Sequence, residues 1–162
     1  MHGTNYHRKM KKIKFLFIFL FAFTTIAYAQ MTPNNSYAYT PEVMLVVKAF
    51  QSGKTYDDTH KIYIAGTGLR YKTAIIDIEN AGDNNVDIDF GQFYLLDDQD
   101  NKYEVSAAVQ GMKMTFTTKE MVFTLKKGKK KRYVVSFWPA FPKDQKITRM
   151  MINGAIVALT DL

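Results

Sequence analysis

AIIDIENAGDNNVDIDF, the sequence from Ala74 to Phe90, decides the fold of this protein. Ala74, Ile76 and Ile78 alternate with positions that include two carboxylates, and side chains of a β-strand point alternately to the two faces of a sheet. Residues 86–90 alternate in the same way. The residues between these two runs are rich in Asn, Asp and Gly, which tolerate the backbone angles of turns. The stretch therefore predicts two half-buried strands joined by a turn.

The rest of the chain repeats this organisation. Apolar segments recur every eight to twelve residues between clusters of Gly, Asn and Asp, a spacing typical of an all-β sandwich or barrel, and no long helical stripe follows residue 29. So many short strands would leave one flat sheet with an exposed apolar face, so we expect a two-sheet antiparallel β-sandwich. The predicted strands are 43–50, 61–65, 69–79, 86–90, 92–96, 102–106, 112–117, 121–125, 132–138, 147–152 and 155–159.

The first 29 residues have the three parts of a secretory signal peptide. A basic segment without acids is followed by the apolar run FLFIFLFAF at 15–23 and then by Ala27-Tyr28-Ala29. This apolar run is shorter than the roughly 20 residues that a membrane-spanning helix needs. Small side chains at Ala27 and Ala29 fit a signal peptidase, so we expect cleavage before Gln30. We also expect translation to start at Met10, because residues 1–9 add nothing that export requires.

Export narrows the possible functions. After cleavage the protein would be soluble in the periplasm or the extracellular space, where ATP and nicotinamide cofactors are scarce; the alternative is an uncleaved signal anchor.

The chain has no cysteine, which excludes disulfides, thiolate zinc sites and cysteine nucleophiles. Of the net charge of +7, the first 29 residues carry +5. The remaining +2 gives no reason to expect a nucleic-acid partner.

The mature chain divides into a leader and one domain. Residues 30–41 contain two prolines and no apolar period, and we interpret them as a flexible leader to a domain at 42–162. Charge is uneven within that domain: residues 42–104 carry −6 and residues 105–162 carry +8. The two halves could interleave and cancel, or they could leave patches that favour head-to-tail self-association.

About half of the chain, from Lys72 to Gly154, resembles a known family. Its order is a strand ending in Asn80, then FYLLDDQDNKY at 93–103, LKKG at 125–128 and YVVSFWP at 133–139. This order resembles that of secreted bacterial immunoglobulin-like domains of unknown function, whose fold is shared with a mycobacterial immunoprotective extracellular protein. The family's usual glycine in the aspartate turn is Asn101 here, which also permits positive φ. The resemblance implies an immunoglobulin-like sandwich for binding or adhesion, and it transfers no catalytic residue.

The strongest local feature is a basic run around one glycine. It consists of Lys126, Lys127, Lys129, Lys130, Lys131 and Arg132. At the tip of a hairpin, these side chains could bind an unidentified protein or an anionic envelope polymer. They could also be a solvated turn that prevents sheet edges from aggregating. No aromatic residue interrupts the run, which argues against nucleic-acid binding.

Other constellations predict chemistry only weakly, so we expect a non-enzymatic protein without a cofactor. Four oxygen-bearing side chains at 97–101 could bind calcium, but the sixth-position glycine and closing glutamate of a calcium loop are missing. Met112 and Met114 share a strand face and could carry copper, although methionine also fills cores. A hydrolase would need His60, the one histidine of the mature chain, with one of its four serines; these are Ser36, Ser52, Ser106 and Ser136, none in a nucleophile elbow.

Overall fold

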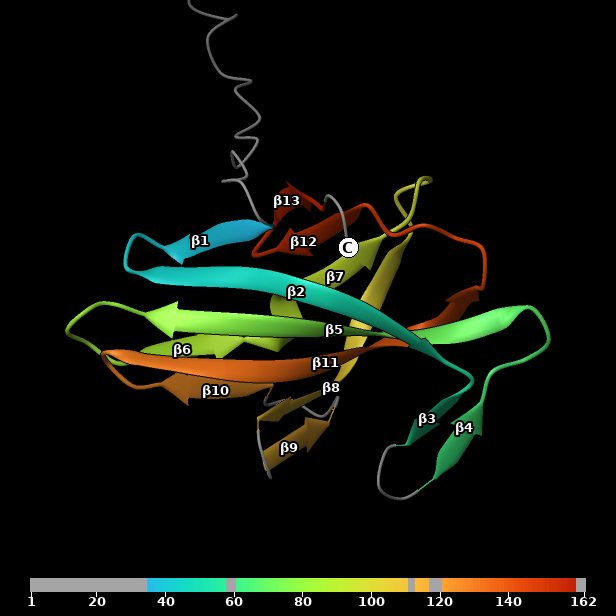
Figure 1. Cartoon of the computed structure of the whole chain (residues 1–162), viewed down its shortest axis with the longest axis horizontal. Helices are drawn as coiled ribbons and strands as arrows, with labels where there is room; N and C mark the ends of the chain where they lie inside the picture. The colour runs from blue at the N-terminus through green and yellow to red at the C-terminus, as the bar shows by residue number, and fades with distance from the viewer. Residues whose placement is uncertain (1–34, 58–60, 111–112, 117–120, 160–162) are drawn as a thin grey trace, which may run out of the picture.

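A computed structural model of the protein describes residues 35–57, 61–110, 113–116 and 121–159 (Figure 1). The signal peptide predicted at residues 1–29 lies outside these ranges. The described strands are β1 (Ser36–Thr40), β2 (Val43–Gly53), β3 (Thr55–Asp57), β4 (Ile62–Ile64), β5 (Leu69–Asn80), β6 (Val86–Asp89), β7 (Phe93–Leu96), β8 (Lys102–Gln110), β9 (Lys113–Phe116), β10 (Val122–Leu125), β11 (Lys129–Pro142), β12 (Arg149–Ile152) and β13 (Ala155–Ala158). A short 3-10 helix, η1, covers Phe90–Gln92. The described segments contain no helix of the length and hydrophobicity needed to cross a membrane.

One large antiparallel sheet supplies most of both layers. Its strand order is β1-β2-β5-β11-β8-β7-β12-β13, with β9 paired to β8. In Figure 1, β1, β2, β5 and β11 form the front of the molecule, and β7 and β12 lie behind them. Two smaller sheets complete the described fold, the pair β10-β6 behind the front strands and the ribbon β3-β4 at one end.

Strand β11 connects the two layers because it pairs along both of its edges. Its whole length follows β5, from Lys129 opposite Asn80 to Pro142 opposite Leu69. On its other edge, residues 134–138 pair with β8. The register shifts near Phe137 in both pairings, and such irregularities bend a strand and increase its twist. The sheet therefore turns at β11 and β8 and faces itself.

Alternating apolar side chains fill the space between the layers. The front strands contribute Leu45, Ile76 and Tyr133, and the rear strands contribute Leu95 and Met150, all without exposed surface. These residues belong to one continuous core cluster. Burial of such side chains is the main favourable term in folding, at roughly 25 cal/mol per Å² of apolar surface.

The observed strands agree with those predicted from the sequence, but their arrangement differs from the predicted one. Each of the eleven predicted strands overlaps an observed one, and the stretch from Ala74 to Phe90 forms strands β5 and β6 joined by a turn. The leader predicted at 30–41 is wrong for Ser36–Thr40, because these residues form β1 on the edge of β2. Strand β3, only three residues long, was not predicted. The two faces of the sandwich come mainly from one folded sheet rather than two separate ones.

Tyr133 is the one residue in the described segments whose buried polar side-chain atom has no hydrogen-bond partner. Its ring packs against Phe90 and Phe123, with ring centroids 5.0 and 5.3 Å away. Burial raises the pKa of its hydroxyl, since the ionised form would lose its hydration. The aromatic ring therefore contributes to packing, while the hydroxyl opposes folding.

We predict that Tyr133→Phe stabilises the protein by about 1 kcal/mol, because the substitution removes a buried polar group that makes no hydrogen bond. Urea unfolding of the two proteins measures the difference. Tyr103→Phe is the matched control, since the Tyr103 hydroxyl lies 3.4 Å from Asp97 Oδ2 and 3.5 Å from Gln145 Oε1 and its loss should not stabilise. A lower urea midpoint for Tyr133→Phe would contradict the assignment.

Candidate binding surface

The basic run lies at one end of the front layer, but it does not form the tip of a hairpin. Lys126 and Lys127 belong to the connection after β10, and Lys129–Arg132 begin β11. Strand β10 pairs with β6, whereas β11 pairs with β5 and β8. The connection therefore passes from the rear layer to the front one. Gly128, with φ of 61°, provides the left-handed turn that this passage uses.

Two of the six cations pair with acids of the neighbouring strand. The β5-β11 register places Arg132 opposite Asp77 and Lys130 opposite Glu79. Arg132 binds both oxygens of Asp77, at 2.6 and 3.0 Å, and Lys130 Nζ lies 3.3 Å from Glu79. The hydrogen bond from Arg132 lowers the pKa of the Asp77 carboxyl group, and Asp77 is only 8% exposed. Arg132 and Lys130 therefore each have a partner on β5.

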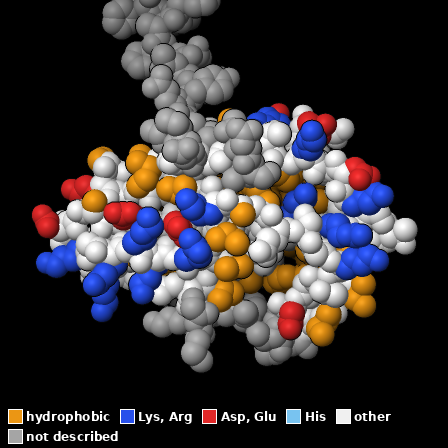
Figure 2. Space-filling view, in the orientation of Figure 1, with side chains coloured by type: hydrophobic (Ala, Val, Ile, Leu, Met, Phe, Trp, Pro, Cys, Tyr) orange, Lys and Arg blue, Asp and Glu red, His pale blue; other side chains and the backbone are white. Residues whose placement is uncertain are grey.

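The other four cations are exposed and remain candidates for binding an anion. They are Lys126, Lys127, Lys129 and Lys131. Figure 2 shows Lys and Arg side chains gathered at the left of the front face, over the end where β11 begins in Figure 1. None of these four lysines lines either of the two hollows described below.

We predict that Arg132→Gln lowers the urea midpoint of unfolding, because it leaves the Asp77 carboxylate, largely covered by its neighbours, without its bidentate partner. Lys131→Gln, one position away on the same strand, removes the same charge from an exposed side chain and should leave the midpoint unchanged. Equal midpoints for the two variants would show that the Arg132 pair contributes nothing to stability.

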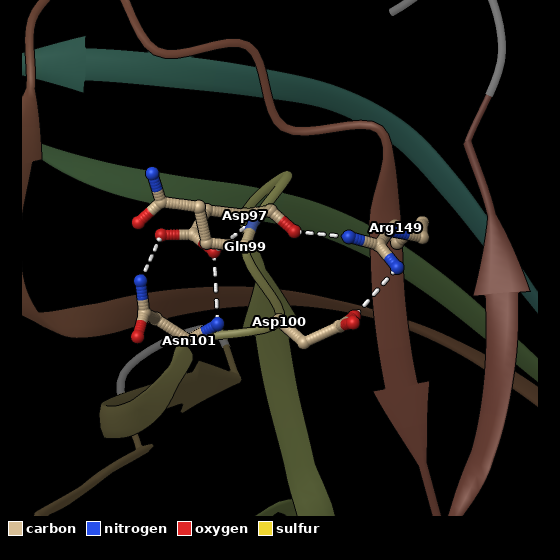
Figure 3. Close-up of polar contacts among 5 residues, drawn as sticks. All are labelled: Asp97, Gln99, Asp100, Asn101 and Arg149. Carbon is tan, nitrogen blue, oxygen red and sulfur yellow. Dashed lines mark hydrogen bonds and ion pairs between the residues drawn. The ribbon is translucent and has the colours of Figure 1, made fainter.

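The aspartate turn between β7 and β8 is built around hydrogen bonds to Asp97 (Figure 3). One carboxylate oxygen accepts from the backbone N–H groups of Gln99 and Asn101, at 2.9 and 2.8 Å, and the other accepts from the Asn101 amide at 2.7 Å. Arg149 lies 2.6 Å from Asp100 and donates to the Asp97 carbonyl. The positive φ falls on Asp100, at 64°, and not on Asn101 as the sequence suggested.

This geometry favours a structural turn over a calcium site. Both carboxylate oxygens of Asp97 already accept hydrogen bonds from protein donors, and the Arg149 guanidinium pairs with Asp100. The described residues contain no group of three or more His, Cys, Asp or Glu side chains placed to hold a metal ion. Burial alone would raise the pKa of Asp97, but hydrogen bonds from Asn101, Gln145 and Gln99 outweigh it and lower that pKa to about 2.

We predict that the Asp97 carboxylate stabilises the protein in a pH-dependent way. Its pKa is lower in the folded chain than the ordinary 3.8, so its contribution is complete above about pH 4 and disappears as the pH falls through 2. Asp97→Asn should therefore lower the urea midpoint strongly at pH 6 and much less at pH 2. The same difference at both pH values would mean that ionisation of Asp97 plays no part.

The alternatives based on methionine and serine receive no support from the described geometry. Met112 and His60 lie outside the described residues, as does the side chain of Met114 in β9. The hydroxyl of Ser106 donates to the Ser136 carbonyl at 3.1 Å, and the Ser136 hydroxyl lies 3.3 Å from that of Thr73. The hydroxyls of Ser106 and Ser136 therefore each contact a neighbouring strand, which is an ordinary structural role.

Four aromatic rings, which the sequence analysis missed, gather at the other end of the front face. They are Tyr56 of β3, Tyr63 of β4, Tyr71 of β5 and Trp138 of β11, called here the aromatic cluster. Trp138 stacks on Tyr71 at 5.5 Å between centroids, with 22° between the planes, and Tyr63 meets Trp138 nearly edge-on at 5.3 Å. Tyr56 lies within 5.6 to 6.2 Å of the other three rings. Such pairs gain about 0.5–1.5 kcal/mol each beyond their burial.

Strand alternation places these rings on the outer face. Tyr133 and Phe137 of β11 point into the core, so the next residue, Trp138, points outward. Tyr56 and Tyr63 are directly opposite each other in the β3-β4 ribbon and share its inner side. Tyr71 is 7% exposed, whereas Trp138 remains 41% exposed. A half-exposed tryptophan on a sheet face is a feature that the core does not require.

A polar groove adjoins the aromatic cluster. It has a volume of about 270 Å³ and is lined by Gln51, Ser52, Gly53, Thr55, Tyr56, Asp57, Tyr71, Thr73 and Ser136. Tyr56 and Tyr71 belong to both features, so the rings and the groove form one surface. Figure 2 shows hydrophobic side chains near the middle of the front face, extending toward the β3-β4 ribbon, beside a hollow.

A second hollow lies at the same end of the sandwich and has a different chemistry. Its volume is about 400 Å³, and three lysines line it together with apolar side chains. Burial lowers the pKa of one of them, Lys72, whose ammonium lies 6.0 Å from the centre of the Phe141 ring. Lys143 pairs loosely with Asp144, at 3.8 Å. This hollow suits an anion better than a neutral ligand.

Comparison with known proteins supports the fold and assigns no activity. No protein family and no curated protein matches the chain in sequence. A conserved hypothetical protein from Bacillus anthracis has a similar structure, with a TM-score of 0.52 and 16% identity over 82% of this chain and 95% of its own.

Two other solved structures resemble the chain more weakly. An uncharacterized β-sandwich protein from Clostridium difficile 630 has a TM-score of 0.47 and 11% identity over 72% of this chain and 83% of its own. The yjhA protein from Bacillus subtilis has a TM-score of 0.46 and 18% identity over 74% and 78%. At such identities, structural likeness concerns the fold alone, and any function must be argued from the surface of this chain.

Proposed function

We propose that this protein is an exported, non-enzymatic binding module with an immunoglobulin-like β-sandwich, acting in the bacterial envelope or the extracellular space. The signal-peptide pattern of residues 1–29 supports export. The proposal that the protein binds a partner rests on one observation: Trp138 is half-exposed on the outer face, beside a polar groove. Tryptophan is enriched at binding hot spots because a large apolar ring with one polar N–H gains much on desolvation.

The aromatic surface replaces the basic run as the first candidate contact. Lys130 and Arg132 pair with acids of β5, and the other four cations are exposed and line neither of the two hollows described above. Exposed charges of this kind contribute little to affinity in salt, although they accelerate association with an anionic partner. We therefore assign them a supporting role in attraction to an envelope polymer, and the contact itself to the surface around Trp138.

We predict that Trp138→Ala reduces binding to isolated envelope material at least tenfold, because it removes the exposed ring of the surface. The protein is expressed with its own N-terminal segment, purified after export, and sedimented with envelope fragments of its host. Val134→Ala is the matched control, since Val134 lies on the same strand, is 38% exposed, and should bind normally.

Circular dichroism and thermal unfolding establish that each variant is folded. Trp138→Phe is the second variant, used if Trp138→Ala unfolds, because it keeps a ring in the aromatic cluster while reducing the exposed surface. Binding by the folded Trp138 variant at the level of the unchanged protein would refute the proposed surface.

A further inference from the structure

The aromatic surface and its groove combine two kinds of chemistry in one place. The aromatic cluster offers an exposed apolar ring, and the adjoining groove offers side-chain hydroxyl and amide groups. Its hydrogen-bonding members outside the rings are Gln51, Ser52, Thr55, Asp57, Thr73 and Ser136. Hydroxyl and amide side chains both donate and accept hydrogen bonds. A ligand of this surface should therefore have an apolar face and a rim of groups that donate and accept.

A pyranose ring has this combination. Its C–H bonds form an apolar face that packs on an aromatic ring, whose negative face attracts the slightly positive hydrogens. Its hydroxyl groups project from the edge and are donors as well as acceptors. Trp138 is placed to receive the flat face, because it is 41% exposed while its stacking partner Tyr71 is buried beneath it.

The charge of the groove favours a neutral sugar over an acidic one. Among the lining residues, Asp57 is the one with a charge at neutral pH, so the lining offers no cation to a carboxylate or sulfate group. Lys72 comes within 3.5 Å of the Ser52 hydroxyl, but its side chain lines the second hollow and not the groove. Of the four exposed lysines of the basic run, Lys129 and Lys131 lie in the first three residues of β11, before Trp138, and the other two precede the strand.

The size of the groove limits how much of a ligand it can hold. Its volume of about 270 Å³ is slightly below the roughly 300–1,000 Å³ of ordinary small-molecule sites. One or two sugar rings therefore fill it, and the rest of a chain continues along the surface. Such a site recognises a segment of a polysaccharide rather than a whole molecule.

We propose that the aromatic surface binds a neutral polysaccharide, with a pyranose stacked on Trp138 and its hydroxyl groups bonded to Thr73, Ser136 and their neighbours in the groove. This inference rests on the proposed function and names its ligand class. It also explains why the basic run and the groove are separate: the lysines attract the protein to an acidic envelope, and the neutral groove selects the sugar.

Trp138 is the single tryptophan of the whole chain, so its fluorescence reports directly on this surface. The experiment titrates the exported protein with three neutral probes, chitohexaose, cellohexaose and maltohexaose, up to about 5 mM. A heparin-derived hexasaccharide is the anionic arm. We expect a saturable shift in tryptophan emission with at least one neutral probe and none with the heparin fragment.

The double variant Thr73→Val with Ser136→Ala keeps the tryptophan but removes two hydroxyls of the groove. We expect it to weaken binding of the active probe about thirtyfold, since two lost hydrogen bonds of about 1 kcal/mol each correspond to that change in the dissociation constant. Val134→Ala is again the matched control and should titrate like the unchanged protein. If the double variant unfolds, Gln51→Ala tests the same groove from strand β2, because Gln51 lies opposite Thr73 in the β2-β5 register and lines the groove.

The outcomes separate this inference from the proposed function. If Trp138→Ala loses binding to the envelope but no neutral hexasaccharide shifts the fluorescence, the surface binds another class of partner and the sugar inference is wrong. A shift with the heparin fragment alone would also overturn it. If the neutral probes bind while Trp138→Ala still sediments with envelope, the sugar site is real and the proposed envelope contact is wrong.

Discussion

The pairing of β11 along both edges is the constraint on which the rest of the structure depends. Its contact with β5 fixes the front layer, and its contact with β8 carries the same hydrogen-bonded sheet into the rear layer. Because side chains alternate along a strand, one register then determines both faces of β11. Tyr133 and Phe137 are buried, and Arg132 and Trp138 are placed outside. A slip of one residue would bury a guanidinium and expose the core.

The same constraint explains which parts of the structure the sequence could predict. Alternation of apolar and polar side chains within β5 and β6 depends only on neighbouring residues. Strand β5 was therefore recognisable from Ala74, Ile76 and Ile78, and β6 from the alternation at 86–90. The aspartate turn was recognisable too, because the hydrogen bonds that Asp97 accepts from Gln99, Asn101 and Tyr103 come from groups no more than six residues away in sequence. Local chemistry determines both features. The immunoglobulin-like topology and the export signal remain predictions.

The features that the sequence could not predict depend on which strands become neighbours. A glycine flanked by lysines between two strands is typical of a hairpin, yet Lys126–Gly128 crosses between layers because β10 pairs with β6. The prolines near β1 made this segment resemble a flexible leader, but it forms a strand because it pairs with β2. Tyr56, Tyr63, Tyr71 and Trp138 are spread over 83 positions of sequence and come together only when the β3-β4 ribbon lies on the front sheet. The outward position of Trp138 was the one local signal.

A purely structural role for the aromatic cluster would be to hold the β3-β4 ribbon on the sheet. Tyr71 fits that role, since it is almost fully buried, and isolated two-stranded ribbons need such packing. Trp138 does not fit it, because an anchor gains stability from the area that it removes from water, and this ring leaves 41% of its surface exposed. Ile62 and Ile64 on the outer side of the ribbon are more exposed still, at 67% and 75%. Exposed apolar side chains therefore lie on the ribbon as well as at Trp138, which favours contact with a partner over anchoring alone.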